Sequence, residues 1–90
     1  MSTTDFDEVW GRIVEHEGQP FTQVRGRVFQ YTVRPASLTL STTNQVVGRS
    51  QFERALKLVP LESPSQIQNL RAPSYIYAIL MDSRVRKQDW

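Results

Sequence analysis

The sequence predicts an α+β domain with an N-terminal helix, a three- to four-stranded antiparallel meander and a C-terminal cluster of three short helices. Three observations favour this class. An apolar stripe of helical spacing opens the chain, alternating apolar and polar residues follow, and serine and proline helix-start signals recur after residue 50. Because ninety residues suffice for one hydrophobic core, we expect a single domain over residues 1–90.

The first element is predicted to be an amphipathic helix at about residues 5–16. Its apolar residues recur at i, i+3, i+4, i+7 and i+8, which places them on one face. These residues are Phe6, Val9, Trp10, Ile13 and Val14. Gly18 suits the end of the helix because glycine tolerates a positive φ, and Pro20 prevents continuation.

Residues 21–49 read as antiparallel strands. The runs FTQV and RVFQYTV flank Arg25 and Gly26, which predict a tight turn. In the second run Phe29, Tyr31 and Val33 are spaced by two, so we expect them to share the buried face. The run SLTLST alternates again, and VVGR is predicted to form a short fourth strand.

Three short helices and a charged tail are predicted to complete the chain. The helices span about 51–59, 64–70 and 73–82, and the tail spans 83–90. Ser50 and Glu53 have capping-box spacing, and Ser63, Pro64 and Gln66 repeat a helix-start signal. We expect the tail to be partly helical or extended, with a mobile end.

Residues 63–80 permit more than one interpretation. A DNA-reading helix-turn-helix is one, because Leu70, Tyr77 and Leu80 occupy positions where that motif needs apolar packing. However, the run YIYAILM at 75–81 is apolar throughout, whereas a recognition helix needs a polar face toward the bases. We therefore favour a buried central helix, while a helix-turn-helix and a partly exposed protein-contact helix stay open.

Three segments of the chain resemble a small uncharacterised bacterial α+β domain. They are FTQVRGRVFQYTV, GRSQFERAL and APSYIYAILMDSRV, and the late segment fits the pattern G/A-P-S-Y-x-x-A-x-L-x-D-x-R. The resemblance covers roughly residues 21–85 and departs at Ala72, where glycine is expected, which leaves the turn before the last helix uncertain. It implies a compact natural domain and brings no activity with it.

Charge is unevenly distributed along the chain. Residues 1–17 hold five acids and one arginine, whereas residues 18–90 hold ten bases and four acids. Nine of the eleven bases are arginine, whose planar fork suits phosphate and carboxylate. This pattern indicates a basic face for an acidic partner, and the alternative is solvated arginines paired with the acidic first helix.

The first functional hypothesis is a small, non-enzymatic nucleic-acid-binding module that contacts phosphates through an arginine-rich face. Its candidate residues are Arg25, Arg27, Arg34, Arg49, Arg71, Arg84, Arg86 and Lys87. Phe29 and Tyr31 lie among these arginines but are expected to point into the core. Without those rings as stacking platforms, binding would be led by phosphate contacts and weakly specific.

The alternative is a protein-interaction module, such as an adaptor, an inhibitor or a subunit, that uses the aromatic last helix. Its candidate residues are Tyr75, Tyr77, Met81 and Trp90. Tyrosine, tryptophan and arginine are enriched at interface hot spots. Self-association as a homodimer is one use of such a patch.

No catalytic residue, cofactor or metal site is predicted. The chain has no cysteine, and its only histidine is His16, which is expected to end the first helix. Its glycines are too widely spaced for a phosphate loop, and no G-x-S-x-G elbow is present. The lack of cysteine fits a reducing cytoplasm, and no apolar run approaches the roughly 20 residues of a membrane span.

Overall fold

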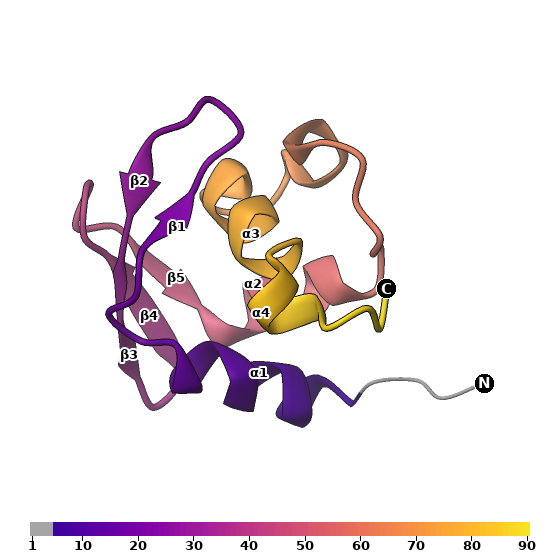
Figure 1. Cartoon of the computed structure of the whole chain (residues 1–90), viewed down its shortest axis with the longest axis horizontal. Helices are drawn as coiled ribbons and strands as arrows, with labels where there is room; N and C mark the ends of the chain where they lie inside the picture. Colours follow the sequence, from indigo (N-terminus) through magenta and orange to yellow (C-terminus); the bar gives the residue numbers. More distant parts are fainter. Residues whose placement is uncertain (1–4) are drawn as a thin grey trace.

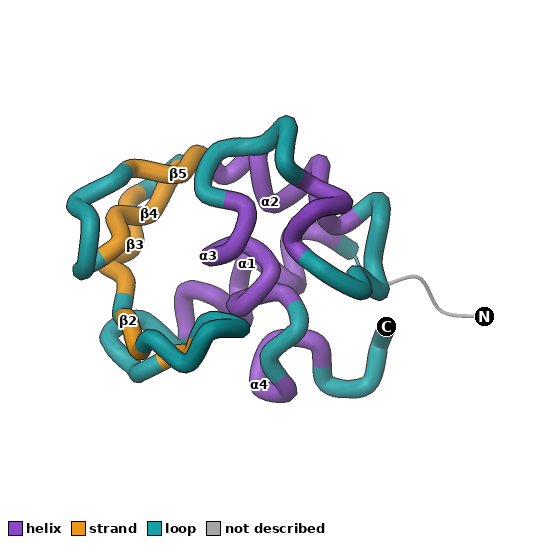
Figure 2. Tube along the Cα trace, turned by 90° about the horizontal axis from the view of Figure 1, so that it is seen from above, coloured by secondary structure: helices purple, strands orange, loops and turns teal. Residues whose placement is uncertain are grey.

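The computed structural model describes residues 5–90, which form the α+β fold expected from the sequence (Figure 1). Strands occupy one side of the molecule, and helices pack against their inner face (Figure 2). The elements are α1 (Phe6–Glu15), β1 (Phe21–Thr22), β2 (Val28–Phe29), β3 (Tyr31–Arg34), β4 (Ser37–Leu40), β5 (Val46–Gly48), α2 (Arg49–Leu56), η1 (Pro64–Ile67), α3 (Pro73–Leu80) and α4 (Ser83–Arg86). Within residues 5–90, no helix combines the length and apolar character needed to cross a bilayer.

Helix α1 confirms the amphipathic prediction. Val9 and Ile13 are fully buried and Trp10 is nearly so, whereas Val14 at the edge of the stripe is 42% exposed. The helix is followed by Gly18, whose φ of +82° is a conformation that favours glycine. Its N–H donates to the carbonyl of Tyr31 at 3.1 Å, so the end of α1 is tied to the sheet.

The strands form two sheets instead of one meander. β1 and β2 pair antiparallel, and β3, β4 and β5 form a separate three-stranded antiparallel sheet. The run predicted as one strand divides at Gln30, whose backbone N–H donates to the hydroxyl of Ser41 at 2.9 Å. The predicted tight turn is confirmed, because the N–H of Gly26 (φ +90°) donates to the carbonyl of Gln23 at 2.8 Å.

The inner faces of both sheets meet in an aromatic cluster. Phe21, Phe29 and Tyr31 are at most 2% exposed, and the ring centroids of Phe21 and Tyr31 lie 5.3 Å apart. The hydroxyl of Tyr31 donates to the carbonyl of Ile13 at 2.5 Å, which joins the sheet to α1. The expectation that Phe29 and Tyr31 point into the core is confirmed, so neither ring is free to stack on a base.

Helix α2 begins earlier than predicted, and the capping-box prediction is wrong. β5 runs directly into the helix, so the N-cap is Gly48, and Ser50 lies inside the first turn. The helix also ends at Leu56 rather than near residue 59. The next predicted helix is a single 3₁₀ turn, η1, which begins after Ser63 as its serine–proline signal indicated.

Helix α3 is the central helix of the domain. Five of its eight residues are buried, including Ile76, Ile79 and Leu80 with no exposure. The interpretation of this stretch as apolar core is confirmed, and a helix buried in this way cannot enter a DNA groove as a recognition helix. Its N-cap, Ala72, has φ +52° and ψ +56°, the left-handed conformation that glycine adopts most easily.

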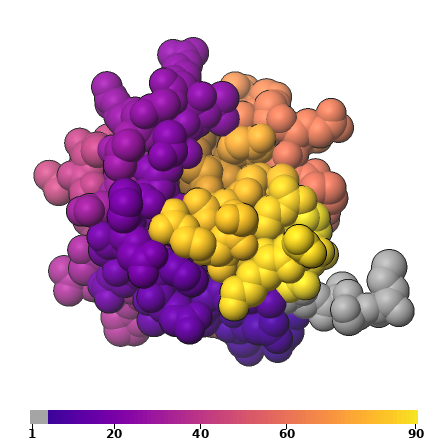
Figure 3. Space-filling model, in the orientation of Figure 1, coloured from indigo at the N-terminus to yellow at the C-terminus, as the bar shows by residue number. Residues whose placement is uncertain are grey.

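The tail is folded onto the domain, and the prediction that it is partly helical is confirmed. Residues 83–86 form α4, Val85 is fully buried, and the indole Nε1 of Trp90 donates to the carbonyl of Leu80 at 2.9 Å. This segment, yellow in Figure 3, lies against α1 on the face shown. Its anchor is Arg12, whose Nη1 donates to the carbonyl of Val85.

Candidate nucleic-acid interface

Three of the eight predicted basic residues, Arg49, Arg84 and Arg86, are bonded within the fold, so the predicted arginine-rich face is not available as a whole. The first is Arg49, whose guanidinium forms an ion pair with Asp7 of α1. The same guanidinium lies 5.0 Å from the ring centroid of Phe6 and 5.9 Å from that of Trp10. For Arg49, the alternative of pairing with the acidic first helix is therefore the one observed.

Arg84 is the second basic residue that serves the fold. Its Nε and Nη2 donate to the two carboxylate oxygens of Asp82 at 2.9 and 3.0 Å, and Nη2 also donates to the carbonyl of Pro20 at 2.7 Å. The guanidinium stacks 4.1 Å from the ring centroid of Phe21. Arg84 thus closes α4 against the start of β1, and its fork has no free side for a phosphate.

The Asp82–Arg84 pair perturbs both ionisations. Burial alone would raise the pKa of Asp82, but hydrogen bonds from the side chain and backbone of Arg84 outweigh it and hold that pKa below its ordinary value. The pKa of Arg84 is raised because its charged form donates to Asp82. Asp82 is also the N-cap of α4, since its Oδ1 accepts the backbone N–H of Arg84 at 2.9 Å.

The remaining candidates near the α1 end of the fold are dispersed. Arg86 donates to the backbone oxygen of Trp90. Arg34 is exposed at the end of β3, but the N–H of its neighbour Val33 donates to the carboxylate of Glu17, so an acid lies close by. Lys87 is exposed just after α4. These positions form no continuous basic face.

A second group of basic side chains is left available at the surface. It combines three predicted residues, from the β1–β2 loop and from the loop before α3, with two residues of α2 and its C-cap that the sequence reasoning missed. We call this group the basic end, and it consists of Arg25, Arg27, Arg54, Lys57 and Arg71. All five are exposed, and none has an ion pair with any residue between 5 and 90.

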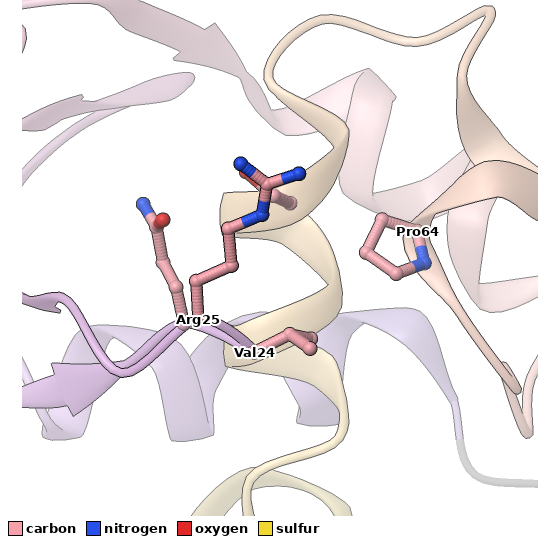
Figure 4. A pocket seen from close by; sticks show the side chains of 5 residues that line it. Val24, Arg25 and Pro64 are labelled. Atoms are coloured by element: carbon pink, nitrogen blue, oxygen red, sulfur yellow. The ribbon is translucent and has the colours of Figure 1, made fainter.

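Three residues of the basic end line two surface pockets. The hairpin pocket, of about 430 Å³, is lined by Gln23, Val24, Arg25, Pro64 and Ser74 (Figure 4). The helix pocket, of about 260 Å³, is lined by Arg54, Lys57, Leu58, Asn69 and Leu70. Each lining contains basic residues and no acidic one. Pro64 lines the hairpin pocket, whereas Asn69 and Leu70, six residues or fewer further along the chain, line the helix pocket. Arg71 follows Leu70 directly.

Part of the basic end lies away from the most acidic helix. The β1–β2 loop and η1 are at the top of Figure 1, whereas α1, which carries Asp7, Glu8 and Glu15, runs along the bottom. Helix α2, which carries Arg54, packs against α1 through Phe52 and Trp10. Glu53 and Glu62 are the acids in the segments that contribute to or adjoin the basic end. The five bases outnumber these two carboxylates, so the field at this end attracts anions.

The sequence signal for the two missed residues was available. Arg54 and Lys57 are three positions apart on α2, so they project on the same side of the helix. The structure agrees, because Leu58 beside them is 53% exposed. The charge pattern allowed arginines to pair with the acidic first helix, but it did not indicate that Arg49 would be the one to do so.

The aromatic patch of the alternative hypothesis is turned inward. Tyr75 is 8% exposed, its hydroxyl is hydrogen-bonded to that of Thr42 at 2.9 Å, and its ring meets Phe29 edge-on at 4.8 Å. Tyr77 and Met81 are half-buried. Trp90, bonded to Leu80, is half-buried too. These four side chains do not form the exposed patch that a protein partner would cover.

His16 is the C-cap of α1, as expected, and its Nδ1 lies 2.8 Å from the carbonyl oxygen of Arg12. In the part of the chain described, 5–90, histidine, aspartate and glutamate side chains nowhere gather in a group of three that could hold a metal ion.

No family model matches the chain, and no similar protein was found among curated proteins or solved structures.

Proposed function

We propose that this domain is a non-enzymatic module that binds nucleic acid through phosphate contacts of the basic end. The observation that carries the proposal is a set of five exposed bases that make no ion pair within residues 5–90. Arg25 lines the hairpin pocket, and Arg54 and Lys57 line the helix pocket. Exposed bases without an internal ion pair keep their full charge for a ligand, and arginine forks match phosphate oxygens.

The basic end is smaller than the arginine-rich face expected from the sequence. Arg25, Arg27 and Arg71 remain part of the proposed interface, whereas Arg49 and Arg84 hold the fold together. Arg54 and Lys57 take their place. Five phosphate contacts are enough for binding that is measurable at low salt and weak at physiological salt.

The interface is expected to recognise the backbone more than the sequence. α3 is buried, and the bases of the basic end come from separate loops and from α2, so we expect the main energy to come from counterion release. The absence of cysteine leads us to propose the reducing cytoplasm as its compartment.

The protein-interaction alternative has less support. It depends on aromatic side chains that make internal hydrogen bonds, as Tyr75 does with Thr42 and Trp90 does with Leu80. A homodimer through this patch would require these contacts to break. Light scattering on the purified protein tests that alternative, because a dimer would support self-association through these aromatic side chains.

A binding titration tests the proposed function. A labelled 20-nucleotide single strand, the matching duplex and an RNA of the same sequence are titrated with the protein at several salt concentrations, with fluorescence anisotropy as the readout. We expect binding at low salt that weakens with a log–log slope of roughly −0.7 to −0.9 per phosphate contact. Absence of binding to all three probes at about 50 mM salt would overturn the proposal.

A further inference from the structure

The hairpin pocket has the size and shape of a small-ligand site. Its volume of about 430 Å³ lies within the roughly 300–1,000 Å³ typical of pockets that hold small molecules. Val24 and Arg25 rise from the β1–β2 loop on one side, and Pro64 from η1 faces them across the opening (Figure 4). A single nucleobase with its sugar belongs to the size class that such a pocket holds.

The walls of the pocket suit a flat aromatic ligand. Val24 is 65% exposed although its side chain is apolar. Together with Pro64 it offers apolar surface to the face of a ring. Arg25 adds a planar guanidinium, a group that stacks on aromatic rings as well as binding phosphate. Bases splayed from a strand are held on side chains of this kind.

Uncharged polar groups of the pocket match the edge of a base. The side-chain amide of Gln23 offers both a donor and an acceptor, and Ser74 offers a hydroxyl. Neither side chain forms a hydrogen bond with any residue between 5 and 90. The loop that carries Gln23 is held by the turn bond from Gly26 and by pairing of β1 with β2, so the site is formed before a ligand arrives.

From this arrangement we propose that the hairpin pocket holds one unpaired base, so the ligand of the basic end is single-stranded nucleic acid. This inference rests on the proposed function and narrows it. In a duplex the bases are stacked and paired, and extracting one costs a few kcal/mol, whereas a single strand offers its bases freely. Arg25, which lines the pocket, supplies a guanidinium for a phosphate next to the captured base.

The test compares three probes of equal length and salt: a single-stranded oligonucleotide, the same strand with abasic sites throughout, and a duplex. The abasic strand keeps the phosphates and lacks the bases. Because base stacking is worth roughly 5- to 150-fold in affinity, we expect the intact strand to bind tighter than the abasic strand by a factor in that range. The duplex is expected to bind more weakly than the intact strand.

A pocket variant and a matched control separate base capture from general effects. The double variant Gln23→Ala, Val24→Ser removes the amide and an apolar wall without changing charge. The control is Gln45→Ala, Val46→Ser, an adjacent glutamine–valine pair before and at the start of β5. We expect the pocket variant to lose the preference for the intact strand over the abasic one, and the control variant to keep it.

The outcomes are distinguishable. Equal binding of intact and abasic strands, equal behaviour of the two double variants, or tighter binding of the duplex would overturn base capture while leaving the phosphate-led function in place. Failure of all probes to bind would overturn both base capture and the proposed nucleic-acid-binding function. Circular dichroism of each variant shows that it is folded.

Discussion

Nη1 of Arg12 donates a 2.8 Å hydrogen bond to the backbone carbonyl of Val85, which joins α1 to α4 across 73 residues of sequence. Arg12 is 9% exposed, and its Nη2 also contacts carboxylate oxygens of Glu8 at 2.6 Å and Asp89 at 2.7 Å. The one base of the acidic first segment is therefore a structural residue. Its bonds explain why the C-terminal segment is folded against α1.

Replacing Arg12 with methionine removes this anchor and keeps the length of the side chain. We expect the free energy of unfolding to fall by about 2–4 kcal/mol, because the carbonyl of Val85 and nearby carboxylates lose their donor in a partly buried site. Urea denaturation followed by tryptophan fluorescence measures the change. Arg34→Met, at an exposed arginine, should alter stability by no more than about 0.5 kcal/mol; equal losses in both variants would contradict this role.

Asp82→Asn tests the pair that closes α4. Asparagine keeps an oxygen for the N-cap but loses the charge, so we expect stability at neutral pH to fall by about 1–2 kcal/mol. The pKa of Asp82 is lower in the fold than its ordinary value of 3.8, so its stabilisation is present above that pH and is lost as pH falls through the folded value. The difference between wild type and variant should therefore shrink in melts from pH 6 down to pH 2. Glu62→Gln, at an exposed acid, serves as the control.

Tyr31→Phe removes the hydroxyl that ties the sheet to Ile13. We expect a loss of about 1–2 kcal/mol, since a buried hydrogen bond is removed while the ring still fills its place. Burial raises the pKa of Tyr31, so the neutral hydroxyl stabilises the fold below the ordinary tyrosine pKa and this part is lost as pH rises above it. Thermal melts compare the variant with Tyr77→Phe, whose hydroxyl lies 3.5 Å from the carbonyl of Glu62. A larger loss of stability from Tyr77→Phe than from Tyr31→Phe would contradict the stabilising role of the Tyr31–Ile13 hydrogen bond.

Ala72→Gly should stabilise the domain. Alanine in the left-handed region destabilises the folded state by about 1–2 kcal/mol, and glycine removes this strain. Glycine also gives the unfolded chain more freedom, which destabilises the fold by about 0.5–1 kcal/mol. We expect a net gain of about 0.5–1 kcal/mol and a higher melting temperature. Ala36→Gly, in a turn without a positive φ, should give no gain. A loss at position 72 would mean that Ala72 contributes packing worth more than its backbone strain.

The sequence predicts best where local periodicity decides structure. The apolar stripe of α1 and the continuous apolar run of α3 depend on residues a few positions apart, and both helices were found. The division of the strands at Gln30 depends on Ser41, and the start of α2 at Gly48 depends on β5 running into it. Contacts of that kind are set by tertiary structure, which a local pattern does not record.

In the candidate site too, local properties were predictable from the sequence and contacts between distant segments were not. Composition correctly marked Arg25, Arg27 and Arg71 as exposed bases, because charged loop residues are solvated in most folds. It did not reveal that Arg49 would pair with Asp7, 42 residues away, because ion pairs between distant segments have no local signature. The contact of the tail with α1 had no local signature either, since it depends on a donor in the first helix.

The most direct test of the phosphate-led interface compares two charge-matched double variants in the salt titration. Arg25→Gln, Lys57→Gln removes one arginine and one lysine from the basic end, and Arg34→Gln, Lys87→Gln removes the same pair of residue types from exposed positions elsewhere. We expect the first variant to bind single-stranded nucleic acid at least about tenfold more weakly and to lose roughly 1.4 from the log–log salt slope, while the second keeps the slope of the wild type. Equal slopes for the two variants would contradict the account, because affinity would then follow net charge and not the basic end.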